Sequence, residues 1–437
     1  MRVTRSRSVA GWIVLAFVTG GTLAAQSGPQ PSLSGPQPSL EERRYAGWVF
    51  TPSIAVGGGW DDNVLLANRA NDPPSDYTSP ISPSASLDFT GKRTRFSTAY
   101  GGAVTLYRSV DELNSFEHSL RAALHQRLTP KLSIVAEETF AKSPTTDAIE
   151  LVGIPFYRVG SRTNTLGGGL DAALSKYTTL SARYSLRNVA FEEDTFTQRG
   201  LLGGHAHEAS ASISRALSTR LTLSGDYSYL RGTEGQATRV TPLSANGTFE
   251  IQSGGAAAIY RVTEFVSLTG GVGIARMSGT EELASTVSQP TSDGSFTSAT
   301  PSLTSSEIGP TFQGGISWRG EHHLASLTYQ RSFIPSFGFG GTFQNEEWVA
   351  NLRVPFARNR AYTDAAFAWF NNEPLVDIQP TLRSLFFSGK LGYRVSRWLT
   401  AEGYYERSQQ NAQVAGGNLD RNQVGFRLVA TRPMRLR

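Results

Sequence analysis

Three features of the sequence predict an all-β fold: a transmembrane, antiparallel up-and-down β-barrel of about 16–18 strands, preceded by an N-terminal signal peptide. Apolar and polar residues alternate along most of the chain from about Val49 onward. Short polar turns alternate with longer polar segments. The chain also contains 44 Gly, 15 Tyr and 23 Phe residues, and glycine mixed with aromatic residues suits short twisted strands better than helices.

The N-terminal residues predict export from the cytoplasm. Arg2, Arg5 and Arg7 precede an apolar run over residues 9–18, and small residues follow at 22–25. The run is shorter than the roughly 20 apolar residues that a spanning helix needs, which favours a signal peptide over a single membrane anchor. We therefore expect residues 1–25 to be a signal peptide.

The next segment predicts a linker. The heptad SGPQPSL occurs twice, at residues 27–33 and 34–40. Repeated proline blocks the hydrogen bonding of helices and sheets, so we expect residues 26–46 to be an extended, disordered tether. A short Pro-rich recognition motif is the alternative interpretation. The outer-membrane barrel is then expected over residues 47–437.

The alternation has the period of a β-strand with one apolar and one polar face. Over residues 221–229 the odd positions are Leu, Leu, Gly, Tyr and Tyr, whereas the even positions are Thr, Ser, Asp and Ser. Residues 180–187 and 423–430 alternate in the same way. Helical spacing fits these windows poorly.

The connections predict how the strands are joined. Tight turns are expected at residues 90–93, 129–131, 175–178, 218–220, 262–264, 319–321, 358–360 and 395–397. Longer polar stretches, such as residues 142–160 and 278–305, separate them. Short turns on one side and long loops on the other are typical of outer-membrane barrels, in which the short turns are periplasmic. Eight turns imply about 16 strands, and the flanking segments near 49–63 and 419–432 raise the number to about 18.

The side-chain types favour a membrane barrel over a soluble sandwich. A sandwich core needs densely packed aliphatic residues, and strands cut by many glycines would pack poorly there. Lipid accepts any apolar shape, and a lumen accepts Ser, Thr, Gly and charged residues. Aromatic residues near the expected strand ends predict interfacial girdles; these residues are Trp48, Phe50, Trp60, Tyr177, Trp318, Trp369, Phe370 and Trp398.

One segment resembles a known family. Residues 49–64, which contain Trp60, Asp61, Asp62 and Asn63, are followed by residues 81–89, a basic turn and Tyr100. This arrangement resembles the bacterial outer-membrane family called β-barrel porin 2, over about the first 70 residues of the barrel. Outer-membrane barrels usually end in an aromatic residue, whereas this chain ends in residues 431–437, TRPMRLR.

The resemblance implies a partner class and a location. Members of that family often lie in exopolysaccharide gene neighbourhoods, which implies export or passage of exopolysaccharide through the bacterial outer membrane. The implied partners are outer-membrane lipid and lipopolysaccharide, the polysaccharide, polysaccharide-export proteins and the barrel assembly machinery.

The residues Asp61, Asp62 and Asn63 have two interpretations. Adjacent residues of a strand point to opposite faces, and Asp and Asn are common turn formers, so the motif predicts the exit of a strand into a loop. The alternative is a calcium site shared with Asp72 and Asp76, because calcium prefers oxygen ligands.

Other ligand and cofactor classes receive little support. His205 and His207 share one strand face, but two ligands are too few for zinc. The sequence contains no cysteine, which excludes a metal site with thiolate ligands. The formal net charge is +5, with the charges scattered rather than gathered in a stripe, so we expect no nucleic-acid partner. We expect no metal, no cofactor and, because no distinctive nucleophile setting occurs, no enzymatic activity.

Charged residues on the polar faces are the candidate functional residues. Parity assigns to the lumen Arg121, His125, Asp171, Arg183, Arg187, Asp226, Arg353, Asp364, Lys390, Glu402 and Arg427. Such charges can set a transverse field that selects solutes. Alternatively they pair with each other and only stabilise the wall.

The sequence thus predicts a porin-like channel that serves exopolysaccharide. A general porin for small solutes is the first alternative, and a long loop folded into the lumen would favour it. A non-conducting structural or interaction barrel is the second.

Overall fold

The computed structural model describes residues 47–146, 156–192, 201–235, 246–282, 287–290, 296–299, 302–320, 322–338, 341–375, 380–412 and 418–436. The expected signal peptide and Pro-rich linker lie outside these residues.

The strands of the first half are β1 (Gly47–Asp61), β2 (Asp76–Thr90), β3 (Thr94–Tyr107), β4 (Ser115–Arg127), β5 (Leu132–Ser143), β6 (Ser161–Ala173), β7 (Thr178–Phe191), β8 (Gly204–Ala216), β9 (Leu221–Gly235), β10 (Asn246–Arg261) and β11 (Val266–Glu282).

The second half adds β12 (Val287–Pro290), β13 (Phe296–Ala299), β14 (Ser302–Arg319), β15 (Leu324–Pro335), β16 (Thr342–Phe356), β17 (Ala361–Pro374), β18 (Leu382–Arg394), β19 (Leu399–Ala412), β20 (Asn418–Thr431) and β21 (Met434–Leu436). Two single-turn 3-10 helices, η3 (Arg69–Asn71) and η4 (Asp111–Leu113), lie between strands. No helix in the described part of the chain is long and apolar enough to span a membrane.

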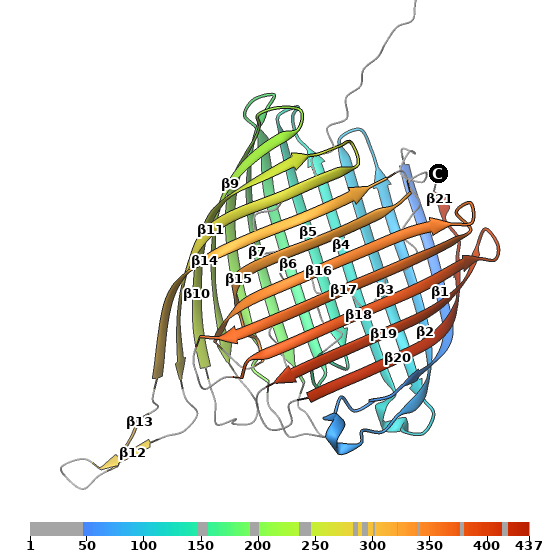
Figure 1. Ribbon diagram of the computed structural model, residues 1–437, viewed down its shortest axis with the longest axis horizontal. Helices are drawn as coiled ribbons and strands as arrows, with labels where there is room; N and C mark the ends of the chain where they lie inside the picture. The colour runs from blue at the N-terminus through green and yellow to red at the C-terminus, as the bar shows by residue number, and fades with distance from the viewer. Residues whose placement is uncertain are drawn as a thin grey trace, which may run out of the picture.

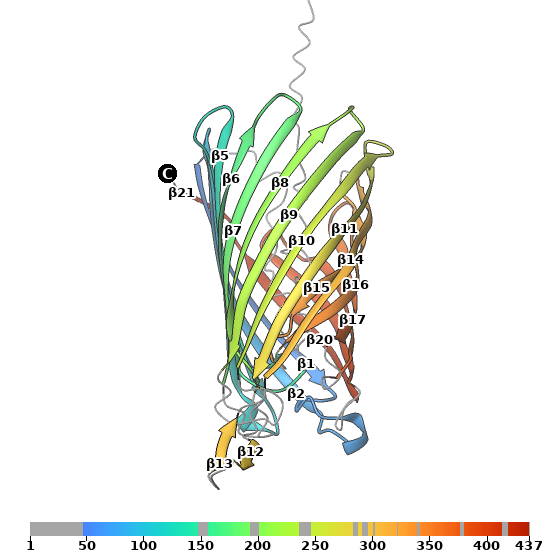
Figure 2. The same cartoon turned by 90° about the vertical axis from the view of Figure 1, so that its left-hand side faces the viewer.

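The strands close into one barrel (Figures 1 and 2). Each barrel strand pairs antiparallel with its neighbour in sequence, and β20 pairs with β1 from Ser53↔Thr431 to Asp61↔Gln423. The result is a closed barrel of 18 strands, β1–β11 and β14–β20, which confirms the predicted fold class. β21 pairs with the beginning of β1. β12 and β13 form a separate hairpin that projects from the end of the barrel where the longer connections lie.

The predicted tight turns are confirmed, and several of them share one chemistry. The hydroxyl of Ser218 accepts a hydrogen bond from the amide of Leu221 at 3.0 Å. Thr129, Ser175 and Thr263 accept the equivalent bond in their own turns, at 3.0, 3.1 and 3.0 Å. Such bonds replace backbone pairing locally and favour a tight reversal. We refer to the end of the barrel where these tight turns lie as the turn end, and to the opposite end as the loop end.

The outer wall is apolar, as a lipid-facing surface requires. Leu180 lies opposite Ile213 and Ile316 opposite Leu327, and all four side chains are exposed. Trp48, Tyr177, Trp318 and Trp398 are exposed near the turn end, and Trp60, Tyr77, Trp348 and Trp369 occupy outward positions near the loop end. Phe370, expected in a girdle, is instead 3% exposed and packs on the inner wall, because its neighbour Trp369 takes the outward position.

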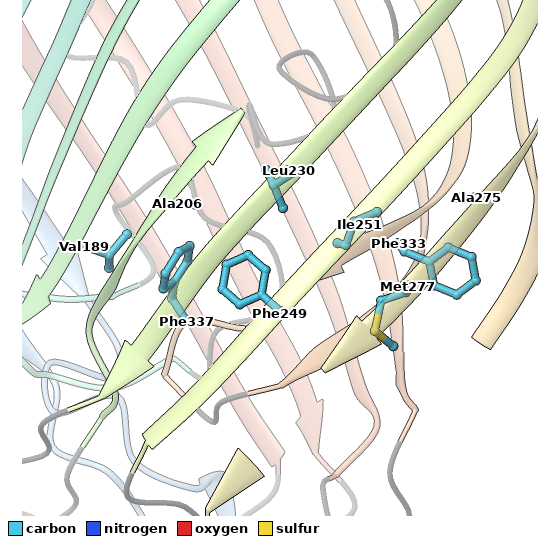
Figure 3. Close-up of a cluster of buried hydrophobic side chains, with 9 residues drawn as sticks. All are labelled: Val189, Ala206, Leu230, Phe249, Ile251, Ala275, Met277, Phe333 and Phe337. Atoms are coloured by element: carbon cyan, nitrogen blue, oxygen red, sulfur yellow. The ribbon is translucent and has the colours of Figure 1, made fainter. Parts of the chain in front are cut away.

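The inner wall is apolar near the loop end, which the sequence analysis did not predict. Inward side chains of β7–β11 form a buried cluster with Phe333 and Phe337 (Figure 3). Pairing between β14 and β15 stops at Phe312↔Arg331. Beyond that point β15 parts from β14 but stays paired with β16 as far as Pro335↔Thr342, and the ring of Phe333 lies over inward-facing Gly309. A Cβ at that position would lie 2.8 Å from the ring, so glycine is what permits this approach.

Candidate functional site: the lumen and the loops that cross it

The connection between β5 and β6 reaches across the loop end of the barrel. The amide of Phe156 donates a 2.8 Å hydrogen bond to Oε1 of Gln410, an inward residue of β19. The Phe156 ring lies 5.0 Å from the ring of Phe386 on β18 and packs against Leu66 and Leu419. Along the wall, β5 and β19 are separated by β4, β3, β2, β1 and β20. The segment 156–160 therefore crosses the mouth instead of standing above its own strands.

Arg158 ties the same segment to two other loops. Its guanidinium donates to the carbonyl oxygens of Val64 and Leu113, both at 2.8 Å, and lies 5.1 Å from the centre of the Tyr107 ring. Val64, Tyr107 and Leu113 form a small buried cluster. Because an arginine offers several donors in a fixed planar arrangement, one side chain can fix three segments together.

A second segment, residues 332–338 together with Gly341, covers the opposite part of the mouth. The ring of Phe337 lies 6.0 Å from that of Phe249 on the inner wall of β10. Gly338 pairs with Leu202 through two backbone hydrogen bonds of 2.8 and 3.0 Å. The amide of Gly341 donates a 2.6 Å bond to a carboxylate oxygen of Glu234. This segment is thus attached by apolar packing and by hydrogen bonds.

Between the inner walls of β1–β5 and β18–β20 lies a cavity of about 230 Å³. Its lining includes both signs of charge and aromatic side chains, among them Glu117, Lys142, Tyr404, Arg421 and Arg427. The cavity lies beside the base of the β5–β6 connection, since Ser143, Pro144 and Thr145 also line it. The arrangement provides a polar space inside the barrel with fixed charges on both walls.

Five of the candidate lumen residues form a charged row across β16–β20. Arg353 lies 3.4 Å from Asp364, and Asp364 is the register partner of Lys390. Arg427 lies 2.6 Å from Glu402, whose other carboxylate oxygen accepts a hydrogen bond from the hydroxyl of Tyr362. The guanidinium groups of Arg353 and Arg427 lie over the rings of Tyr362 and Tyr404, at 5.7 and 5.8 Å. Opposite charges on successive strands therefore form one continuous network.

Asp171 and Arg183 form a pair on a different part of the inner wall. Their side chains lie 2.6 Å apart, and the hydroxyl of Ser181 also donates to Asp171 at 2.7 Å.

The other candidates share the inward parity of their strands, opposite the exposed apolar side chains; these are Arg121, His125, Arg187 and Asp226. Six of the predicted residues thus form ion pairs with one another, as the alternative interpretation expected, and a role in solute selection stays a prediction.

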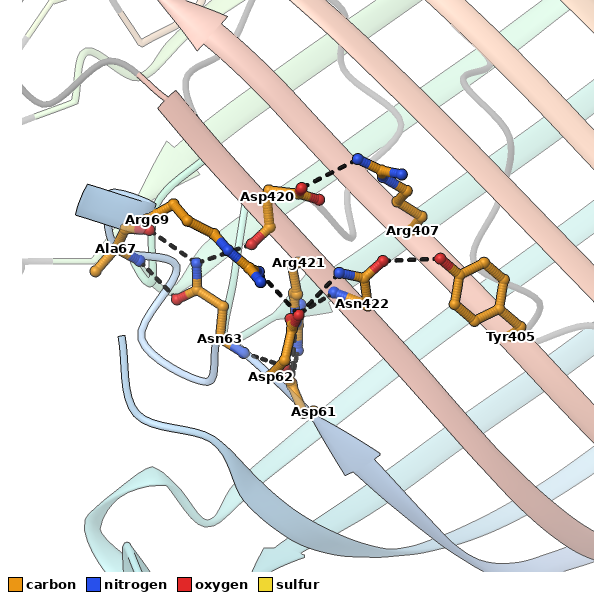
Figure 4. Close-up of polar contacts among 10 residues, drawn as sticks. All are labelled: Asp61, Asp62, Asn63, Ala67, Arg69, Tyr405, Arg407, Asp420, Arg421 and Asn422. Atoms are coloured by element: carbon orange, nitrogen blue, oxygen red, sulfur yellow. Dashed lines mark hydrogen bonds and ion pairs between the residues drawn. The ribbon is translucent and has the colours of Figure 1, made fainter. Parts of the chain in front are cut away.

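The motif Asp61-Asp62-Asn63 lies where β1 ends, as predicted, and its side chains join the first strand to the last (Figure 4). Asp61 is 1% exposed and is held by Arg421 at 2.6 and 3.0 Å, by Gln423 at 3.0 Å and by the amide of Asn63 at 3.0 Å. Asn63 in turn donates to the carbonyl oxygens of Ala67 and Asp420. A buried ion pair therefore reinforces the backbone pairing that closes the barrel.

Asp62 points to the other face and makes a second connection to β20. It accepts hydrogen bonds from the amide and the side chain of Asn422, at 2.6 and 2.8 Å, and from Arg69 at 3.0 Å. Partial burial acts to raise the pKa of Asp62, but the bonds from Asn422 and Arg69 outweigh it and lower the pKa below its ordinary 3.8. Tyr405 extends this outer network by a 2.7 Å bond to Asn422.

The predicted metal alternatives are not assembled by the fold. Within the residues that the structure describes, no group of three or more His, Asp or Glu side chains is placed to hold a metal ion. Asp76 accepts bonds from the amides of Tyr77 and Ser109, both at 2.8 Å, and is thus engaged by backbone donors. His205 and His207 both face outward, with ring centres 5.6 Å apart.

Sequence reasoning did not identify Phe156, Arg158, Gln410 or Phe337. These side chains act across the barrel, and nothing local marks their partners. A weaker signal exists for the apolar inner wall, because the apolar residues change parity near the loop ends of β9 and β10. There Leu230 and Ile251 are inward, whereas Arg231 and Gln252 are outward.

An even-stranded, closed antiparallel barrel with an apolar outer belt, aromatic girdles, short turns and long loops defines a transmembrane β-barrel of the bacterial outer membrane. No family model matches the chain, and no curated protein matches its sequence.

Among solved structures it is similar to OpdO of Pseudomonas aeruginosa, with 14% identity, coverage of 89% of this chain and 98% of that chain, and a TM-score of 0.43. It is also similar to OccAB2 of Acinetobacter baumannii, with 11% identity, coverage of 89% of this chain and 98% of that chain, and a TM-score of 0.42. For the alcaligin outer-membrane receptor FauA of Bordetella pertussis the identity is 11%, the coverage is 89% of this chain and 76% of that chain, and the TM-score is 0.42.

Proposed function

We propose that this protein is a passive, porin-like channel that admits small polar solutes across the outer membrane. The observation that carries the proposal is the crossing segment 156–160, which is bonded to the far inner wall at Gln410 beside a charged cavity. A barrel of this strand number is wide enough to hold an aqueous lumen. A loop folded across that lumen limits the size of what passes.

The inner charges supply selectivity in this proposal. The row from Arg353 to Arg427 presents alternating charges along one wall, and Asp171 with Arg183 does so on another. In a narrow aqueous space such fixed charges act on a permeating ion more strongly than they would in bulk water. The proposed role is transport and not catalysis. The outward-facing His205 and His207 bond to Thr233 and Tyr184.

Passage of an exopolysaccharide, which the resemblance of residues 49–64 implies, is the second candidate. The hydroxyl-rich inner faces of β8 and β9 favour it, since Ser210, Ser212 and Ser224 point inward and can bond sugar hydroxyls. A polymer chain would require segment 156–160 to leave the mouth. Contacts with polysaccharide-export proteins and the assembly machinery belong to the same proposal.

Single-channel recording in planar bilayers tests the proposal. Stepwise conductance is expected for the folded protein, and Gln410→Ala combined with Phe156→Ala should increase it because the crossing segment loses its far attachment. Gln409→Ala is the matched control, since Gln409 is exposed on the outer wall next to buried Gln410. Folded protein without conductance would refute the channel and favour a structural barrel. Block by long oligosaccharides, but not by monosaccharides, would favour polymer passage over small solutes.

A further inference from the structure

A polar patch interrupts the outer wall at the loop end of β8–β11. His205 and His207 on β8, Arg231 on β9 and Arg276 on β11 all face outward and are exposed. His207 is the register partner of Arg231. Arg231 and Arg276 are separated by β10, which places the two strands about 10 Å apart. The patch therefore holds two permanent cations and two imidazoles on one continuous surface.

The depth of the patch in the membrane follows from the residues next to it. Toward the turn end the same strands expose Ile213, Leu223 and Val272, which are lipid-facing. Between the apolar belt and the patch lie Tyr184 and Tyr227, both exposed. The Tyr184 hydroxyl lies 2.6 Å from Nδ1 of His207, and the Tyr227 hydroxyl donates to Gln252 at 3.5 Å. Tyrosines with an apolar body and a bonded hydroxyl mark the headgroup level, so the patch lies at the headgroups of the outer leaflet.

The two arginines of the patch differ from other outward arginines near this level. Arg331 lies 3.7 Å from Glu346, and Arg407 lies 3.0 Å from Asp420, so each has an acidic partner. Among the residues described, the side chains of Arg231 and Arg276 make no hydrogen bond or ion pair. Glu250 is the register neighbour of Arg231, and its carboxylate accepts a bond from Gln252 at 2.7 Å. Two arginines thus remain available to an external anion.

We propose that this patch binds the phosphate groups of an outer-leaflet lipid headgroup, that is, of lipopolysaccharide. The planar guanidinium groups match phosphate geometry, and the imidazoles and Gln252 supply further polar contacts. Cations beside an anionic membrane surface strengthen association with its lipids. The site lies on the outer wall, so it does not depend on whether the lumen conducts.

The test measures binding of purified lipopolysaccharide to the folded protein in detergent micelles by calorimetry. Arg231→Gln combined with Arg276→Gln should weaken binding roughly thirtyfold, since each arginine near an anionic surface contributes appreciably to affinity. Arg215→Gln is the matched control, because Arg215 is exposed at an outward position of β8 at the turn end. This control should bind as the wild type does.

Two further probes identify the source of the phosphate. Dephosphorylated lipopolysaccharide should bind the wild type about as weakly as intact lipopolysaccharide binds the double variant. Equal binding of the intact and dephosphorylated lipids, or equal loss in Arg215→Gln, would overturn the proposal. Inorganic phosphate that binds as tightly as the lipid would show a free-anion site and overturn the lipid assignment. Heat-dependent gel mobility verifies that each variant is folded.

Discussion

Replacement of Arg421 by alanine is expected to be one of the most destabilising single changes in the barrel. Arg421 holds the 1% exposed carboxylate of Asp61 through bonds of 2.6 and 3.0 Å, at the seam where β20 meets β1. The variant leaves that carboxylate buried with Gln423 and the Asn63 amide as its remaining donors.

The magnitude follows from the burial of the pair. Removal of one partner of a buried ion pair typically costs about 3–5 kcal/mol, because the other charge remains desolvated. Two of the five hydrogen bonds to Asp61 survive, so we expect a loss near the lower limit, about 3 kcal/mol. Arg421→Met combined with Asp61→Leu removes both charges and is expected to cost less than Arg421→Ala alone.

Equilibrium urea unfolding in lipid vesicles, followed by tryptophan fluorescence, measures these differences. Arg407→Ala is the control, because the Arg407–Asp420 pair also joins β19 to β20 near the loop end but its side chains are 39% and 25% exposed. That variant should lose no more than about 1 kcal/mol. If Arg421→Ala and Arg407→Ala cost the same, or if the double variant is less stable than Arg421→Ala, the seam does not depend on burial of the pair.

Three other predictions follow from the same structure. Because hydrogen bonds lower the pKa of Asp62 below 3.8, its ionised form adds stability at neutral pH that is lost as the pH falls through the lowered pKa. Asp62→Asn should therefore be less stable than the wild type at neutral pH, and the difference in urea midpoint should disappear well below pH 3.8. A pH-independent difference would contradict this. Gly392→Ala should lower the free energy of unfolding by about 1–3 kcal/mol, because the Tyr362 ring lies against Gly392 and must move, which breaks its bond to Glu402. Gly403→Ala should be neutral in the same unfolding assay, because a Cβ added at Gly403 would have nothing within 4 Å. Lys390→Glu should shift the reversal potential toward cation selectivity in bilayers with a salt gradient, since it reverses one charge of the inner row. Arg394→Glu at the end of β18 is the control. Equal shifts in both variants would indicate a general charge effect.

Much of the barrel could be predicted because its determinants are local. A tight turn is encoded by a few residues, as the bond from Ser218 to the Leu221 amide illustrates. The alternation of Leu221 to Tyr229 fixes which face each strand turns to lipid. The even strand number followed from counting such turns. The exit of β1 at Asp61 was predicted for the same reason, since Asp and Asn are local turn formers.

The contacts that shape the lumen could not be predicted in this way. Arg421 and Asp61 are 360 residues apart, and only closure of the barrel brings them together. Phe156 meets Gln410 across the mouth through a contact that no periodicity encodes. The assumption of one polar inner face failed at the loop end, where Leu230 and Ile251 turn inward. The alternation of apolar and polar residues predicts that a strand has two different faces. It does not predict which parts of the inner face a folded loop covers.

The separation of β15 from β14 gives the two sides of the mouth different attachments. Swinging residues 332–338 outward would return Phe333 and Phe337 to water at a cost of about 3–6 kcal/mol for these two rings alone. On the other side, segment 156–160 is held mainly by directional bonds, from the Phe156 amide to Gln410 and from the Arg158 guanidinium to Val64 and Leu113, together with packing of the Phe156 ring on Leu66 and Leu419. Burial of apolar surface therefore restrains residues 332–338, whereas polar bonds that single substitutions can remove one at a time restrain segment 156–160.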